Sequence, residues 1–178
     1  SNMSSSMQKR YNTVELTHQT IEHSITNARI TLQLFEATDP EVEKKLNQEN
    51  DAISQEISEQ VAQIEKGLSS PQERELFQEV TQDREAYKAA RAKAKKLLMD
   101  KKRDQALATL SDEVIPSLEK YRASWQKFIN LQTAAMEQTM KESQQAYAAG
   151  RSVALLLLVI TLVLATFAAV SVTTSITT

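Results

Sequence analysis

Arg84, Tyr87 and Arg91 lie on one face of a helix predicted for the segment DREAYKAAR, residues 83–91. At about 100° per residue, their side chains fall within roughly 60° of one another around the helix. Three apolar side chains share the same arc: Phe77, Val80 and Leu98. We therefore expect this face to be buried, where an unpaired guanidinium charge is costly. Each arginine needs a partner that neutralises it.

Two kinds of partner are compatible with this pattern. Two guanidinium groups about 10 Å apart along the helix axis suit a short dicarboxylate or a tricarboxylate, with the Tyr87 hydroxyl fixing its orientation. Alternatively, Asp or Glu from a neighbouring helix pairs with each arginine, or both side chains extend along the apolar surface to water. The sequence leaves these alternatives open.

The rest of the sequence carries no pattern typical of an enzyme or a metal site. Cysteine is absent, which excludes disulfides and thiolate metal sites. His18 and His23 are five residues apart and point to different faces of a helix, so they are not expected to bind one metal ion. No nucleophile elbow or phosphate-binding loop occurs. We expect a protein that is not an enzyme and has no cofactor.

The composition favours helices almost throughout the chain. The 178 residues include only two glycines and three prolines, whereas Ala, Glu, Gln, Lys and Leu are abundant. This length suffices for one domain of ordinary size with its own core. The net charge of -2 gives no global basic field, which argues against nucleic acid as the main partner.

Four long helices are predicted, with approximate bounds 7–37, 40–66, 71–100 and 116 onward. Asp39 is placed to cap the second helix, and Ser70 with Glu73 forms a capping box for the third. Gly67 fits a left-handed cap at the end of the second helix. Residues 99–116 are interpreted as a less regular connection with a bend and a short helical segment. Long helices joined by short turns predict an all-α fold, an antiparallel up-and-down four-helix bundle.

The first predicted helix is apolar on two sides. Its wide stripe consists of Val14, Ile21, Ile25, Ala28, Leu32 and Phe35. Its narrow stripe, on nearly the opposite side, consists of Leu16, Ile30 and Leu34. A helix that is apolar on two sides needs two partners, so we expect it to pack against its own domain and against another chain.

Residues 153–172 have the length and composition of a transmembrane helix. The segment VALLLLVITLVLATFAAVSV contains no charge, proline or glycine, and about 20 such residues cross the hydrocarbon core of a bilayer. We expect the fourth bundle helix to run into this C-terminal transmembrane helix. The chain then divides into a tag or disordered start (1–6), a helical domain (7–149), a transmembrane helix (150–174) and the start of a linker (175–178). We expect it to be part of a longer protein.

This organisation resembles the four-helix-bundle sensory domain of bacterial methyl-accepting chemotaxis receptors, related to the enteric aspartate receptor. The resemblance covers about residues 7–178 and rests on the architecture and on the segments NARITLQLFEATDP, DREAYKAARAKA, IPSLEKYRASWQKF and VSVTTSITT. It implies a periplasmic ligand-binding domain, an inner-membrane anchor, a preceding transmembrane helix and a parallel homodimer. It also implies that residues 175–178 begin a cytoplasmic linker, which leads to a HAMP relay and the kinase-coupling machinery.

The resemblance also implies two further candidate ligand-binding residues. Arg29 is similar to arginines that reach the ligand from the first helix of the aspartate receptor. Thr109 is the nearest equivalent of a threonine that the family uses at the start of the fourth helix. Because the family's cluster of several arginines on the first helix is reduced to Arg29 here, aspartate is not the expected ligand. A C4-dicarboxylate such as malate or succinate, or citrate, fits Arg84, Tyr87 and Arg91 better.

Two other functions remain compatible with the sequence. Sensor histidine kinases share this architecture, so the helical domain could belong to one of them. A passive dimeric helical module without a small-molecule ligand would use the same bundle. The passive module predicts that Arg84 and Arg91 are paired with acids or solvated, whereas a sensor predicts that they bind a small carboxylate.

Overall fold

The computed structural model describes the backbone of residues 2–176 and the side chains of residues 5–147, 151, 157, 158 and 161. The elements in this range are all helical: α1 (Asn2–Glu36), α2 (Pro40–Gly67), α3 (Pro71–Met99), α4 (Arg103–Thr109), the π-helical turn η1 (Leu110–Val114) and α5 (Ile115–Ile176). The chain divides into two compact units, residues 1–135 and residues 136–178. The predicted all-α fold is confirmed.

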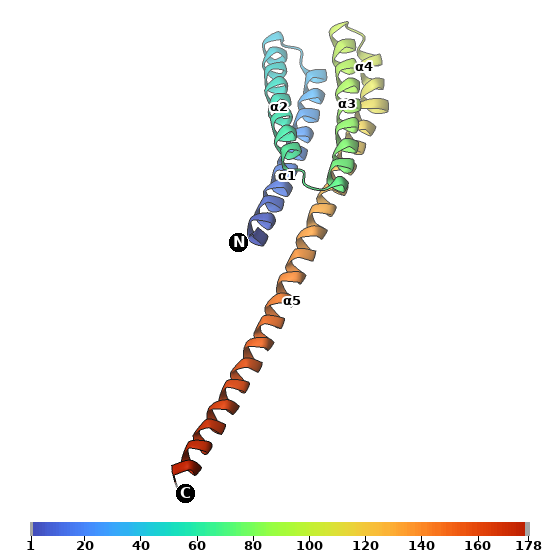
Figure 1. Ribbon diagram of the computed structural model, residues 1–178. Coiled ribbons are helices and arrows are strands. Elements are labelled where there is room, and N and C mark those ends of the chain that lie inside the picture. Colours follow the sequence, from blue (N-terminus) through green and yellow to red (C-terminus); the bar gives the residue numbers. More distant parts are fainter. Residues whose placement is uncertain (1, 177–178) are drawn as a thin grey trace. The chain divides into compact units, whose positions relative to one another are not determined.

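Within residues 1–135 the long helices alternate in direction (Figure 1). α1 and α2 form one hairpin, and α3 forms a second hairpin with α4, η1 and the first part of α5. This is the arrangement of an up-and-down four-helix bundle whose fourth helix is assembled from α4, η1 and α5. The turns between the hairpin arms are three residues long, as close antiparallel neighbours require.

Aromatic side chains from α3 and α5 form the centre of the core. Phe77 and Phe128 both pack against Trp125, with ring centroids 6.2 Å and 5.7 Å from the Trp125 ring. Tyr87 stacks on Tyr121 with centroids 6.2 Å apart and an angle of 16° between the rings. All five side chains are buried. Such pairs contribute about 0.5–1.5 kcal/mol each beyond the burial of apolar area, so they hold α3 firmly against α5.

The inner face of α1 is polar. Five residues at helical spacing are at most 1% exposed: Thr17, Thr20, Ser24, Asn27 and Thr31. We call these five residues the polar seam. The hydroxyl of each threonine and serine in the polar seam donates to the carbonyl four residues earlier, at 2.7–2.9 Å. Because these donors are satisfied inside the helix, the polar seam can be buried without a large penalty.

The two apolar stripes of α1 are buried to different extents. In the narrow stripe, Ile30 and Leu34 are buried. In the wide stripe, Phe35 is buried, but Ile25 and Leu32 remain 42% and 45% exposed. The wide stripe therefore leaves apolar surface uncovered in the single chain.

The predicted helix starts are confirmed at two turns, and one predicted helix end is wrong. The Asp39 carboxylate accepts from the Glu41 amide at 2.9 Å, and Ser70 and Glu73 form both bonds of the capping box. Gly67 is not a left-handed cap, because it is the last residue of α2 and no glycine of the described backbone has a positive φ. Leu68 instead continues in an extended conformation, which leads directly into the extended Ser70.

The left-handed residue lies at the end of α3. Lys101 has a φ of 60°. The Lys101 amide donates to the Leu98 carbonyl at 3.0 Å, and the Lys102 amide donates to the Leu97 carbonyl at 2.9 Å. This pair of bonds is a Schellman motif, which here has lysine where glycine is usual.

The fourth bundle helix begins at Arg103 and not near Pro116. Ala106, Leu110 and Val114 are buried at a spacing of four residues, so the segment expected to be a bend with a short helical segment is helical from Arg103 onward and packs against α3. The π-helical turn η1 comes directly before Pro116, and the Ile115 amide donates to the Leu110 carbonyl five residues earlier. A wide turn at this point accommodates a proline that would otherwise clash with the preceding helical turn.

In the unit formed by residues 136–178, α5 continues as a helix to Ile176. Met140 and Tyr147 are exposed there. Most side chains of the predicted transmembrane helix, residues 150–174, lie outside the described residues. In the part of the chain whose side chains are described, no helix is long and apolar enough to span a membrane.

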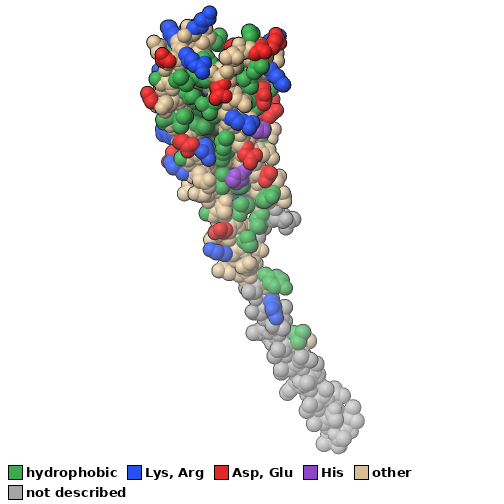
Figure 2. Space-filling view, turned by 180° about the vertical axis from the view of Figure 1, so that it is seen from behind, with side chains coloured by type: hydrophobic (Ala, Val, Ile, Leu, Met, Phe, Trp, Pro, Cys, Tyr) green, Lys and Arg blue, Asp and Glu red, His purple; other side chains and the backbone are tan. Residues whose placement is uncertain are grey.

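Charged side chains of both signs are mixed over the face of the helical domain shown in Figure 2. Lys and Arg side chains alternate there with Asp and Glu, and hydrophobic side chains lie between them. Such mixing agrees with the small net charge of -2 and is typical of a solvated surface.

Candidate functional site

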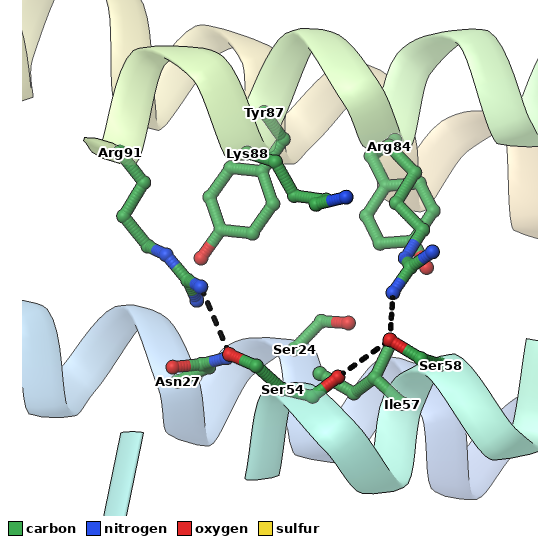
Figure 3. A pocket seen from close by; sticks show the side chains of 10 residues that line it. Ser24, Asn27, Ser54, Ile57, Ser58, Arg84, Tyr87, Lys88 and Arg91 are labelled. Carbon is green, nitrogen blue, oxygen red and sulfur yellow. Dashed lines mark hydrogen bonds between the residues drawn. The ribbon is translucent and has the colours of Figure 1, made fainter. Parts of the chain in front are cut away.

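A pocket lies inside the bundle, between its two hairpins (Figure 3). The α1–α2 hairpin contributes Ser24, Asn27, Ser54, Ile57 and Ser58, and the second hairpin contributes Arg84, Tyr87, Lys88, Arg91 and Tyr121. The pocket has a volume of about 70 Å³, which is room for a few water molecules. The three residues predicted to share the functional face of α3 are therefore brought together in one cavity.

The two arginines span the pocket and bond to serines on α2. Arg84 donates to the Ser58 hydroxyl at 2.8 Å, and Arg91 donates to the Ser54 hydroxyl at 3.0 Å. Figure 3 shows the two guanidinium groups at opposite ends of the pocket, with Tyr87 and Lys88 between them on α3. These two hydrogen bonds link the hairpins across the cavity.

Among the described side chains, no acid from a neighbouring helix pairs with either arginine. The nearest carboxylate to Arg84 belongs to Glu85 on the same helix, at 4.0 Å, and Glu85 bonds to Lys88 at 2.9 Å. Among the described side chains, Arg91 takes part in no ion pair within 4.0 Å. The pocket lining holds three cationic groups and no acid. A serine hydroxyl satisfies a guanidinium hydrogen bond but leaves its charge uncompensated.

Tyr87 forms the wall between the two arginines. The Arg91 guanidinium carbon lies 5.6 Å from the centre of the Tyr87 ring, a cation–π contact. Among the described residues, no partner meets hydrogen-bond geometry with the buried hydroxyls of Tyr87 and Tyr121. Burial raises the pKa of both tyrosines, and the opposing effect of Arg91 on Tyr87 does not cancel this shift. Both phenols are therefore neutral at physiological pH and available as donors to an anion.

Comparison with known families matches residues 1–147 to the four helix bundle sensory module for signal transduction, the module of methyl-accepting chemotaxis proteins. The chain belongs to this family. The match covers every residue that lines the pocket. No curated protein matches the chain. The family consists of signal-transduction modules of chemotaxis receptors and is not an enzyme family.

Two predicted ligand-binding residues of the sensory module lie away from the pocket. Arg29 is exposed on α1, and Thr109 is buried at the end of α4. Neither lines the pocket that holds Arg84 and Arg91. Thr109 also does not begin the fourth helix, because that helix starts six residues earlier at Arg103.

The sensory module places in the pocket several polar residues that the sequence analysis missed: Ser24, Asn27, Ser54, Ser58, Lys88 and Tyr121. Ser54 and Ser58 are four residues apart on α2, and Ser24 and Asn27 are three apart in the polar seam. This spacing places each pair on one helix face, which was the available signal. No group of three or more potential metal-binding side chains occurs among the described residues of the module.

Proposed function

We propose that this sensory module binds a small organic anion in the pocket between its hairpins, a C4-dicarboxylate such as malate or succinate, or citrate. The observation that carries the proposal is the pair Arg84 and Arg91, which face a cavity with serine partners and no acid from another helix. A guanidinium group binds a carboxylate strongly because it donates two parallel charge-assisted hydrogen bonds. The anion supplies the negative charge that these arginines do not receive from an acidic side chain of the pocket lining.

The bound anion lies between the two guanidinium groups. One carboxylate pairs with Arg84 and the other with Arg91, and the Tyr87 hydroxyl donates to a carboxylate oxygen. Because the pocket has a volume of only about 70 Å³, the arginine side chains must turn from Ser54 and Ser58 toward the entering anion. Binding therefore exchanges two hydrogen bonds between hairpins for bonds through the ligand.

We further propose that residues 150–174 cross the bacterial inner membrane and that residues 7–149 lie in the periplasm. The apolar segment 153–172 supports this proposal, because it matches the thickness of a bilayer. Residues 175–178 then begin the cytoplasmic linker to a HAMP relay and the kinase-coupling machinery. The exposed part of the wide stripe on α1, with Ile25 and Leu32, supports a homodimer.

The signal passes along α5. α5 carries Tyr121 at the pocket and continues as one helix to Ile176. A ligand that changes how the hairpins pack displaces α5 by an ångström or two, and a rigid helix carries this displacement to its far end. The ligand shifts the signalling equilibrium only by the difference between its affinities for the two states.

The test is a thermal-shift screen of the purified chain in a mild detergent against malate, succinate and citrate, repeated with Arg84→Ala. An acid present at a hundred times its dissociation constant adds about 2.7 kcal/mol to the free energy of unfolding, which raises the melting temperature by several degrees. We expect this shift for the wild type and its loss in the variant. No shift with any of the acids would favour a passive helical module.

A further inference from the structure

Asn27 lines the pocket with one amide atom satisfied and the other without a partner. Its Nδ2 donates to the Ser54 hydroxyl at 2.8 Å, whereas its Oδ1 is buried and accepts no hydrogen bond. Figure 3 shows Asn27 beside Ser54, at the Arg91 end of the pocket. Asn27 itself is 1% exposed, so bulk water does not reach it.

The orientation of the Asn27 amide is fixed by Ser54. The Ser54 hydroxyl uses its only proton to donate to the Asn50 carbonyl at 2.7 Å. It therefore has only lone pairs left for its neighbours, and these accept from Asn27 and Arg91. If the Asn27 side-chain amide were turned over, its Oδ1 would face the Ser54 oxygen. This is unfavourable because both atoms would then be acceptors. The free Oδ1 is therefore a permanent acceptor in a pocket otherwise rich in donors.

A ligand satisfies Oδ1 of Asn27 only if it carries a hydrogen-bond donor in addition to its carboxylates. Either a hydroxyl or an ammonium group could donate to Oδ1. The three cationic side chains of the lining, Arg84, Lys88 and Arg91, repel an ammonium group, and no acid in the lining compensates it. A neutral hydroxyl has the required donor without the charge.

We infer that the pocket selects anions that carry a hydroxyl group in addition to their carboxylates, and that Asn27 is the specificity-determining residue that accepts from this hydroxyl. The inference rests on the proposed function, because it requires that an anion binds between the arginines. It divides the proposed ligands into two groups. Hydroxylated acids such as malate and citrate bind tightly, and their unsubstituted counterparts bind weakly, because an acid without a hydroxyl leaves Oδ1 unsatisfied or dependent on a trapped water.

The test uses pairs of acids that differ only at the substituent. Malate, succinate and aspartate share a C4-dicarboxylate skeleton with a hydroxyl, a hydrogen and an ammonium group at the same carbon. Citrate and tricarballylate form a second pair with and without a hydroxyl. Calorimetric titration of each acid into the purified 178-residue chain gives the dissociation constants. We expect malate to bind about tenfold more tightly than succinate, citrate about tenfold more tightly than tricarballylate, and aspartate more weakly than succinate.

The variant Asn27→Ala identifies the residue that makes the distinction. We expect it to bring malate and succinate to within about twofold of each other, whereas Asn12→Ala, an exposed asparagine on the same helix, leaves the tenfold ratio intact. If Asn27→Ala does not fold, the ratios of the dissociation constants within each pair of acids, measured on the wild type, still test the inference. Equal affinities within both pairs, or the tightest binding by aspartate, would overturn the inference and leave the proposed function standing. Binding by none of the five acids would overturn both.

Discussion

Arg91 on α3 donates to the hydroxyl of Ser54 on α2 at 3.0 Å, so a charged side chain of one hairpin is held by a neutral side chain of the other. The same hydroxyl accepts from Asn27 on α1 at 2.8 Å and donates to the Asn50 carbonyl at 2.7 Å. Ser54 thereby joins three helices through one oxygen atom. Ser58, one turn further along α2, is exposed and joins only two helices, because it accepts from Arg84 on α3 and donates to the Ser54 carbonyl on its own helix at 2.8 Å.

Replacing the two serines should therefore have unequal effects on stability. Ser54→Ala removes the acceptor of a buried amide, and we expect it to lower the free energy of unfolding by about 1–3 kcal/mol. Ser58→Ala should cost less than about 1 kcal/mol, because water can reach Arg84 in place of the lost hydroxyl. Denaturant titration of both variants measures the difference. Equal losses would show that Ser54 does not hold the three helices together.

Glu73 provides a pH-dependent contribution to stability. It is buried at the start of α3 and bonds to Arg10 on α1 at 2.6 Å. Although burial alone raises its pKa, hydrogen bonds from Ser69, Ser70 and Arg10 prevail and lower it from 4.5 to about 2. Because the folded pKa lies below the unfolded pKa, this contribution is complete above about pH 4.5 and is lost as the pH falls toward 2.

Glu73→Gln should expose this pH dependence, because glutamine keeps the capping geometry but not the charge. We expect a loss of about 1–3 kcal/mol in the free energy of unfolding at pH 7, and a smaller loss as the pH approaches 2. Glu75→Gln, an exposed position on the same helix, is the matched control and should change little. A difference between Glu73→Gln and the wild type that is the same at pH 7 and pH 3 would refute the assignment.

Lys101, which has a left-handed backbone conformation after α3, is a position at which the natural residue does not give the highest stability. Lys101 has a φ of 60°, which costs a non-glycine residue free energy. Lys101→Gly should raise the free energy of unfolding by about 0.5–1 kcal/mol, even though glycine increases the entropy of the unfolded chain. Lys102→Gly, whose φ is -92°, should give no gain. Thermal unfolding of both variants provides the comparison, and equal melting temperatures would contradict it.

The exposed part of the wide stripe on α1 predicts how copies of the chain associate. Ile25 and Leu32 are seven residues apart and more than two-fifths exposed. The double variant Ile25→Glu with Leu32→Glu should fold but sediment as a monomer, because charges would be buried between copies. Leu107→Glu, at a similarly exposed site on α4, is the control and should leave the oligomeric state unchanged. A double variant that sediments like the wild type would exclude this face as the dimer interface.

The features that could be predicted from the sequence are those decided by neighbouring residues. Asp39 and Ser70 cap their helices through bonds that reach at most four residues along the chain, so local patterns identify them. The common face of Arg84, Tyr87 and Arg91 also follows from one helix alone. In contrast, Ser54, Ser58 and Asn27 enter the pocket through the alignment of separate helices, which no local pattern specifies.

Several features of the fold were not predicted because residues act against their usual preference. The polar seam could not be identified from the sequence, because the satisfaction of its buried threonines by the carbonyls of their own helix is invisible in composition. Pro116 suggested a helix start, but the π-helical turn before it lets the helix continue through the proline. Lys101 likewise occupies a position where glycine is the usual signal.

The central claim is that Arg84 and Arg91 together hold one anion inside each bundle. Isothermal titration of malate and of citrate into the wild-type chain, Arg84→Ala, Arg91→Ala and the control Arg122→Ala tests it directly. Arg122 is on α5 and pairs with Glu119 away from the pocket lining. We predict one anion per wild-type chain, at least tenfold weaker binding in each pocket variant and unchanged binding in the control. Equal affinities for all four proteins, or no binding of either acid to the wild type, would contradict the claim.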